Sequence, residues 1–199
     1  MSNTENNLPM RSNRNIPVEM PHPGLLESLD DLLAYAESYA TFTMRGSGHL
    51  GATLMALSAN GTLMFLPGST PDAQAKDEFV RIARLVCIAH CATAVVLVAE
   101  AWMSRQPGPS ERRSAASDPQ EIIMVQGEAP ESRKQKMLPI IRDKSGMFCR
   151  FGTSGDFQSE GVRGRFSRFL PPRPPSPEIQ SAAKGVLATL GVTLQQVEL

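Results

Sequence analysis

The chain has 199 residues and a mass of 21.6 kDa, a length typical of one domain with tails. Its 20 basic and 20 acidic side chains give a formal net charge of zero, which argues against a protein that works mainly as a polycation on nucleic acid or anionic membranes. The composition, 41% hydrophobic and 20% charged, excludes collagen, a coiled coil and a wholly disordered chain.

We expect a soluble protein of a reducing cytoplasm. Residues 1–20 lack the apolar stretch and small-residue cleavage site of a secretory signal. The run 85–103 is strongly apolar, but His90 and Glu100 interrupt it, so we interpret it as a helix end followed by a strand rather than as a membrane span. The chain has three cysteines, an odd number and too few for a disulfide framework: Cys87, Cys91 and Cys149.

The first predicted element is an amphipathic helix that follows a polar arm. Residues 1–23 are polar and proline-containing, and we expect them to be mobile. From Leu25 to about Ala40 apolar residues recur at helical spacing. The opposite side is acidic, with Glu27, Asp30, Asp31 and Glu37.

A β-hairpin is predicted next, from segments 49–59 and 62–66. The pair Asn60-Gly61 between them is typical of a type I′ turn, which needs a positive φ at both central residues.

A second helix is predicted to start at Thr70-Pro71-Asp72, where Thr can cap, Pro fits the first turn and Asp favours the positive helix end. The following segment Thr93–Trp102 has a continuous apolar run, which indicates a central strand. The predicted apolar stripe of this helix contains Phe79, Ile82, Ala83, Val86 and Ala89.

Further strands are predicted at 121–126, 134–142 and 147–151, with a turn at 143–146 between the last two. Pro139 would place the second of these at an edge or a bulge. A final helix is predicted from Ser176-Pro177-Glu178 to Gly191. Its predicted apolar face contains Ile179, Ala182, Ala183, Val186, Leu187 and Leu190.

This order, α-β-β-α-β-β-β-β-α, predicts an α+β fold, because helices and strands do not alternate regularly. We expect an antiparallel or mixed sheet of about five to six strands with helices packed on one face. The predicted organisation is a mobile arm (1–23), a core domain (24–152), an Arg/Phe/Pro-rich loop or linker (153–177) and a C-terminal helix and tail (178–199).

Cys87, His90 and Cys91 are predicted to share one face of the second helix. They are weak candidates for zinc ligands, with His49 or Cys149 as a fourth. A cysteine–histidine nucleophile pair is weaker still, because no acidic residue is placed to orient it and buried thiols are inert. Their apolar neighbours favour packing in the core instead.

Glu100 interrupts an apolar strand and is a weak candidate for a general base or metal ligand, joined by Glu121 or Glu128. The interpretation we favour is an ion pair at the end of the strand. The candidate partners are Arg105, Arg112 and Arg113.

The segment 150–173 combines basic and aromatic residues, which is typical of surfaces that bind single-stranded nucleic acid. In the alternative, the phenylalanines anchor a loop to the core while the arginines stay in solvent. The candidate residues for nucleic-acid or partner binding are Arg150, Arg163, Arg165, Phe166, Arg168 and Phe169. The run 171–175 favours polyproline II, as a spacer or as a ligand for an aromatic groove.

The strand Thr93–Trp102, the loop residues Ser117-Asp118-Pro119 and the segment Glu121-Ile122-Ile123 together resemble a pattern of uncharacterised bacterial and phage-type proteins. In that pattern a hydrophobic strand ends in an acidic-Ala-Trp step and a Ser/Pro-rich loop leads to a Glu-led strand. The resemblance covers about residues 70–152 and implies a bacterial origin, but no activity. No basic residue lies between Pro119 and Glu121, which departs from the pattern.

No common catalytic or cofactor-binding signature occurs, and no cofactor is predicted. Our first hypothesis is a non-catalytic interaction module whose terminal helix docks on a protein partner or on a second copy. The alternatives are a nucleic-acid-associated protein and a metal-dependent hydrolase. Residues 1–103 carry 6 basic and 10 acidic side chains, whereas residues 104–175 carry 13 and 8. The excess basic charge of the second part pairs either with the acidic side chains of the first part or with an anionic partner.

Overall fold

The computed structural model describes residues 26–67, 72–103, 119–153, 155–157 and 166–197. Predicted features in 1–25, 68–71, 104–118, 154, 158–165 and 198–199 lie outside these residues, including the N-terminal arm. The elements in chain order are α1 (Leu29–Ser47), β1 (Thr53–Ser58), β2 (Gly61–Phe65), α2 (Ala73–Ala89), β3 (Ala94–Met103), β4 (Gln120–Ala129), β5 (Ser132–Arg142), β6 (Phe148–Phe151), β7 (Gly155–Phe157), α3 (Pro177–Thr189) and β8 (Gln195–Val197).

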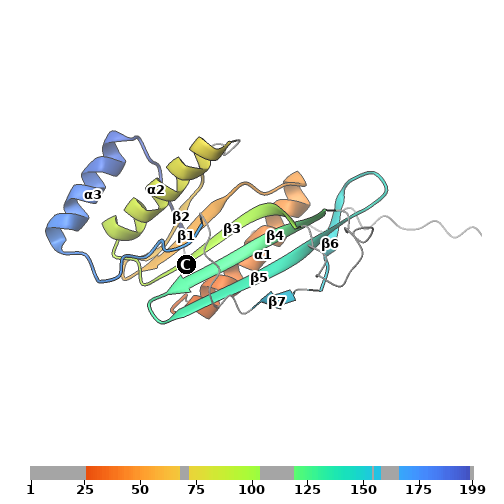
Figure 1. The fold of residues 1–199 in the computed structure, drawn as a ribbon, viewed down its shortest axis with the longest axis horizontal. Helices are drawn as coiled ribbons and strands as arrows, with labels where there is room; N and C mark the ends of the chain where they lie inside the picture. The colour runs from red at the N-terminus through yellow and green to blue at the C-terminus, as the bar shows by residue number, and fades with distance from the viewer. Residues whose placement is uncertain (1–25, 68–71, 104–118, 154, 158–165, 198–199) are drawn as a thin grey trace, which may run out of the picture.

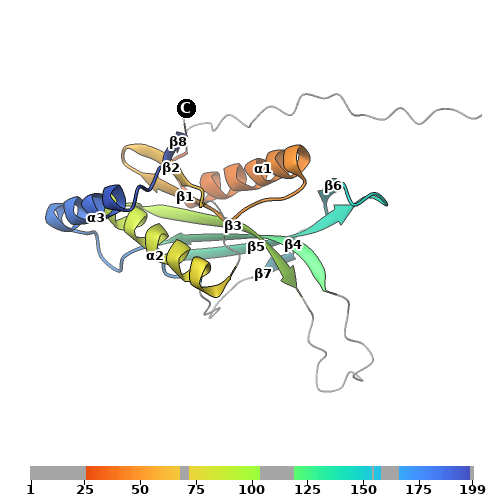
Figure 2. The ribbon, with the colours of Figure 1, turned by 90° about the horizontal axis from the view of Figure 1, so that it is seen from above.

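The strands form one antiparallel sheet in the order β6-β5-β4-β3-β1-β2-β8, and β7 pairs with β5 beside this path. Helix α1 lies over one face of the sheet and α2 over the other, with α3 next to α2 (Figure 1 and Figure 2). The α+β class and the antiparallel sheet are therefore confirmed. The described strands outnumber the five to six predicted, because the short segments β7 and β8 also join the sheet.

The prediction that all helices pack on one face is wrong, and β3 shows why. Val96 and Val98 of this strand pack in the cluster that contains α1, whereas Val95 and Leu97 pack with Phe79 of α2. A central strand that is apolar on both sides must be covered on both sides, because successive side chains point to opposite faces. The continuous apolar run thus requires one helical layer on each face.

Helix α1 begins later and ends later than predicted. Ser28 and Asp31 form a capping box at its start, and Gly48, with φ +77°, ends it. The helix approaches β4 very closely: a Cβ added at Gly127 would lie 2.9 Å from Cδ1 of Leu29 and 3.1 Å from Cδ2 of Leu33. Glycine at this position allows α1 to lie directly on the sheet.

Part of the charge asymmetry is satisfied between α1 and β5. Nζ of Lys134 lies 2.5 Å from Oδ1 of Asp30, and Nζ of Lys136 lies 2.5 Å from Oε1 of Glu37. The acidic face of the helix therefore meets basic side chains of the strand. Both pairs are accessible to solvent, so each contributes at most about 1 kcal/mol.

The predicted hairpin is confirmed, but the turn type is not. Ser58 pairs with Gly61, so the two turn residues are Ala59 and Asn60. Gly61 alone has the positive φ, +104°, and no positive φ occurs at Asn60. The Ser58 hydroxyl accepts the N–H of Asn60 and donates to the carbonyl of Gly61, which stabilises this turn without a type I′ geometry.

Helix α2 begins at Ala73, and the Asp72 carboxylate caps it by accepting the N–H of Ala75 at 2.8 Å. Asp72 thus has the capping role predicted for Thr70, because the helix starts two residues later than predicted. The next strand, β3, is central, with β1 on one side and β4 on the other, as predicted. In the described part of the chain no helix is both long and apolar enough to cross a membrane.

Strands β4 and β5 are longer than predicted and form a continuous antiparallel pair. Pro139 lies in β5 between the residues that pair with β7 and those that pair with β6. The missing N–H therefore falls where the outer edge of β5 changes partner, close to a register shift that the structure shows between Ile141 and Arg142. The predicted turn at 143–146 is confirmed, with the Asp143 carboxylate accepting the N–H groups of Ser145 and Met147.

Helix α3 is confirmed at both ends, with Ser176 as the cap and Gly191 in the left-handed conformation after it. It packs against α2 rather than on the sheet (Figure 2). Beyond the helix, β8 returns to the sheet and pairs with β2.

Candidate functional site: the face of α2 and α3

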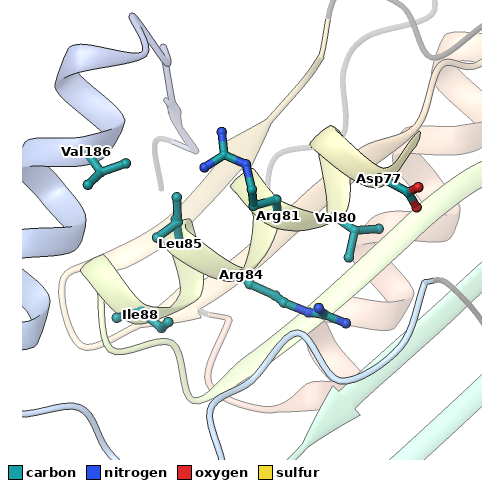
Figure 3. Close-up of a pocket in the computed structure, with 7 residues that line it drawn as sticks. All are labelled: Asp77, Val80, Arg81, Arg84, Leu85, Ile88 and Val186. Atoms are coloured by element: carbon teal, nitrogen blue, oxygen red, sulfur yellow. The ribbon is translucent and has the colours of Figure 1, made fainter. Parts of the chain in front are cut away.

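Helices α2 and α3 run side by side in opposite directions (Figure 1 and Figure 2). An open groove of about 720 Å³ lies along the outer side of α2 next to α3 (Figure 3). Its lining residues are Asp77, Val80, Arg81, Arg84, Leu85, Ile88 and Val186.

The apolar wall of this groove arises because the apolar stripe of α3 is wider than the surface that α2 covers. Only Ala183 and Leu187 of α3 are buried, in a cluster with Val86 and Ala89. Large apolar side chains on the neighbouring side of α3 stay exposed: Ile179 by 54%, Val186 by 42% and Leu190 by 43%. Residues seven and eleven positions apart lie on one side of a helix, so these three form a continuous row.

We call the combined surface the α2–α3 face. Its members are Arg81, Leu85 and Ile88 of α2 and Ile179, Val186 and Leu190 of α3. Figure 3 shows that Leu85 and Val186 point toward each other across the groove. Of the six residues predicted for the apolar face of α3, only Ala183 and Leu187 are buried, and the other four are exposed.

The polar rim of the groove carries both signs of charge. Nη2 of Arg81 lies 2.6 Å from Oε1 of Glu78. This hydrogen bond lowers the pKa of the Glu78 carboxyl and raises that of Arg81. Asp77 adds a second carboxylate at the N-terminal end of the groove. The face as a whole therefore presents an apolar centre with mixed charges beside it.

Arg84, one of the residues that line the groove, also contacts a segment that we call the strap, Phe166–Leu170. The guanidinium of Arg84 donates to the carbonyls of Ser167 and Arg168, each at 3.1 Å. Within the strap Phe169 is buried, with 3% of its surface exposed. The ring of Phe166 packs edge-on against Phe79 of α2, with centroids 6.2 Å apart. These contacts attach the strap to α2.

Glu128 attaches the same strap to the sheet. Its carboxylate is buried on β4 and accepts the backbone N–H groups of Arg168 at 2.9 Å and Phe169 at 3.2 Å. Arg168 adopts a positive φ of +60°, which turns the two N–H groups toward this acceptor. Burial, together with the negative charge of Glu128, raises the pKa of the Cys87 thiol to about 12.

The predicted shared face of Cys87, His90 and Cys91 is wrong. Helix α2 ends at Ala89, with His90 as its C-cap, and Cys91 has a positive φ of +50° as the chain turns toward β3. Cys87 points into the core, whereas Cys91 is only partly buried. Burial and the nearby Lys184 lower the pKa of His90. The candidate ligands therefore do not converge on one point of a helix.

Glu100 lies near the exposed end of β3, where its carboxylate accepts the backbone N–H of Leu50. Glu121, on the neighbouring strand, forms an ion pair with Arg142, whose Nε lies 2.6 Å from Oε2. Glu121, and more weakly Glu100, raise the pKa of Arg142. Glu128 lies at the other end of β4, opposite Val95. The three favoured arginine partners, Arg105, Arg112 and Arg113, lie outside the described residues.

These carboxylates do not form a metal centre. Among the residues that the structure describes, no group of three or more His, Cys, Asp or Glu side chains is arranged to hold a metal ion. Arg142 pairs with Glu121 and also donates to the carbonyl of Gly48 at 3.0 Å. The arrangement therefore neutralises charge and connects β5 to the end of α1.

The candidate nucleic-acid residues are separated by the fold. Arg150 is exposed on β6 and Arg168 is exposed in the strap, whereas Phe166 and Phe169 point into the cluster around Phe79. The ring of Phe169 is buried and has no free face on which a base can stack, whereas Phe166 is partly buried. Arg163 and Arg165 lie outside the described residues.

Arg84 and Glu128 help to position this surface, although the local sequence pattern predicts no contact for Arg84 and only a metal ligand for Glu128. Their partners in the strap are 83 and 84 residues away for Arg84 and 40 and 41 residues away for Glu128. The spacing of residues within one helix or strand does not predict contacts between residues so far apart in the sequence. Comparison with known proteins adds no assignment, because no family model, curated protein or solved structure matches the chain significantly.

Proposed function

We propose that this chain is a non-catalytic protein-interaction module that docks through the α2–α3 face. The observation that carries the proposal is the row of exposed Ile179, Val186 and Leu190 beside the half-buried Leu85 and Ile88. Burying a side chain of this size fully contributes about 1.5–3 kcal/mol. A contiguous apolar row next to a groove is typical of an interaction site, whereas scattered single residues are ordinary surface.

The chemistry of the face supports binding rather than catalysis. Its centre is apolar, and its rim holds Arg81, Glu78 and Asp77, a distribution that matches the apolar core and polar rim of protein interfaces. Two parallel ridges of side chains with a groove between them accept a helix in the way that helix-binding grooves do. We propose a reducing cytoplasm as the compartment, since all three cysteines are free thiols.

The proposal is tested by photo-crosslinking in the cells that encode the protein. A photoreactive amino acid at position 186 should produce an adduct with another polypeptide. The matched control places the same amino acid at Ser181, which is exposed on the same helix but outside the face. An equal adduct yield at the two positions, or none at either, would contradict docking through this face.

A further inference from the structure

We infer that α3 and β8 form one C-terminal arm that opens as a unit while the other helices and strands stay in place. We call residues 177–197 the arm. In the closed state the arm completes the α2–α3 face and covers the outer edge of β2. Opening removes the face and uncovers this edge, so one movement changes two surfaces, whichever partner docks on the face.

The helix of the arm is attached by few buried side chains. Helix α3 has two buried residues among 13, Ala183 and Leu187, whereas α2 has six among 17 and α1 has eight among 19. These two side chains pack with Val86 and Ala89 of α2 in a cluster of four buried residues. An element that buries so few apolar side chains opens at a lower free energy than the core of the protein.

The strand of the arm is attached to the sheet over a short length. Strand β8 lies at the end of the strand order, and its three residues pair with Thr62, Leu63 and Met64 of β2. Gln195 and Gln196 are exposed. A three-residue pairing at the edge of a sheet exposes its hydrogen bonds to solvent and contributes little to holding the arm closed.

Helix α3 and strand β8 are connected so that they move together. The N–H of Val192 donates to the carbonyl of Leu187 at 3.1 Å. Val192 and Leu194 also pack against the cluster that contains Leu187. Gly191, with φ +65°, turns the chain between them and the helix. Because the turn packs on the same cluster as α3, movement of α3 away from α2 also carries β8 away from β2.

The arm begins beyond a firmly attached segment, the strap. Arg84 and Glu128 bind the backbone of the strap, and Phe169 is buried in the core. Four of the next five residues, 171–175, are prolines, which have no N–H to donate to the sheet. The carbonyl of Pro175 accepts the side-chain amide of Gln180, which belongs to the arm itself. The strap is therefore the fixed end, and 171–175 connects it to the moving part.

Opening changes the state of β2. Strand β1 continues to pair with one side of β2, whereas the N–H and carbonyl groups that face β8 lose their partners. An exposed strand edge of this kind can pair with a strand of another chain. The closed arm therefore protects β2 from such pairing, and the open arm removes this protection.

The experiment follows amide hydrogen exchange of the purified full-length chain residue by residue with NMR. Protected amides of α3 and β8 should share one opening constant, about 100-fold or more above that of β1 and β3. Leu187→Ala removes the larger buried side chain of α3 and should accelerate exchange in α3 and β8 equally, by about thirtyfold or more. Leu190→Ala is the matched control, since 43% of this side chain is exposed, and it should change exchange by about twofold at most.

Gly127→Ala separates the opening of the arm from unfolding of the whole chain. The added Cβ crowds Leu29 of α1 against β4, a contact that is the same whether the arm is closed or open. Exchange in β3 and β4 should therefore accelerate by about fivefold or more, while exchange in α3 and β8 stays unchanged. In the wild type, low concentrations of urea should accelerate β3 more steeply than α3, because global unfolding exposes more surface than opening of the arm.

Three results would overturn the inference. The first is exchange in α3 and β8 as slow as in β1 and β3. The second is an acceleration by Leu187→Ala that occurs in α3 but not in β8. The third is an equal response of the arm and of β3, either to Gly127→Ala or to urea, since this would show that the arm opens only when the whole chain unfolds.

Discussion

The buried carboxylate of Glu128 accepts a hydrogen bond from the backbone N–H of Phe169 at 3.2 Å, in the layer between α2 and the sheet. The N–H of Arg168 donates to the same oxygen at 2.9 Å. One charged side chain of β4 thus satisfies two N–H groups of the strap and fixes the Phe169 ring in the core. The strap leads to α3, so this contact helps to position the α2–α3 face.

Glu128→Gln should lower the free energy of unfolding by about 1–2 kcal/mol, because a neutral amide replaces the charged acceptor of two N–H groups. Glu128→Ala should cost about 3 kcal/mol or more, since both N–H groups then remain unsatisfied inside the protein. Urea denaturation measures both values. Glu131→Gln is the control, because Glu131 is exposed in the turn between β4 and β5. Equal effects at positions 128 and 131 would contradict the anchoring role.

Substitution of two glycines by alanine should have opposite effects. Gly127→Ala should destabilise the protein by about 1–3 kcal/mol, because the new Cβ would lie 2.9 Å from Leu29 Cδ1. Gly185→Ala should stabilise it by about 0.5–1 kcal/mol, since no atom lies within 4 Å of the added Cβ in the middle of α3. Thermal or urea unfolding distinguishes the signs. A stabilising Gly127→Ala would show that α1 does not lie against β4 at this point.

The native thiols should differ in reactivity toward a disulfide reagent at pH 8. Cys149 is exposed and should react at once, whereas Cys87 is buried, with its pKa raised to about 12, and should react only after unfolding. The same shift affects stability at high pH. The thiol ionises near pH 9.0 in the unfolded chain but near 12 in the folded one, so its contribution is complete below pH 9.0 and is lost as the pH rises toward 12. Cys87→Ala should remove this part of the alkaline destabilisation; an unchanged alkaline profile would contradict it.

Lys184→Gln should raise the pKa of His90 without restoring it to its usual value. Burial is the larger cause of the lowered pKa and remains, whereas the positive charge of Lys184 is removed. Proton NMR of the imidazole over a pH series measures the shift. A lowered histidine pKa stabilises the folded state above the unfolded value near 6.5, and this contribution is lost as the pH falls through the folded pKa. An unchanged His90 pKa would show that α3 does not lie beside the end of α2.

Local signals in the sequence determined the helices, the strands and several of their ends. The capping residues Ser176 and Asp72, the turn at 143–146 and the continuous apolar run of β3 act within a few residues of one another. Such interactions form in the same way in most surroundings. The α+β class followed from the order of these elements.

Only the tertiary structure decided which surfaces are covered. Ala183 and Val186 belong to the same apolar stripe of α3, yet α2 covers the first and leaves the second exposed. Periodicity shows that a helix has an apolar side but not how much of that side its neighbour buries. In the same way Glu128 meets Phe169 across 41 residues, a contact that exists only after the sheet has brought β4 beneath α2. The spacing of neighbouring residues determines the helices and strands, whereas packing between distant segments determines the α2–α3 face and the position of the strap.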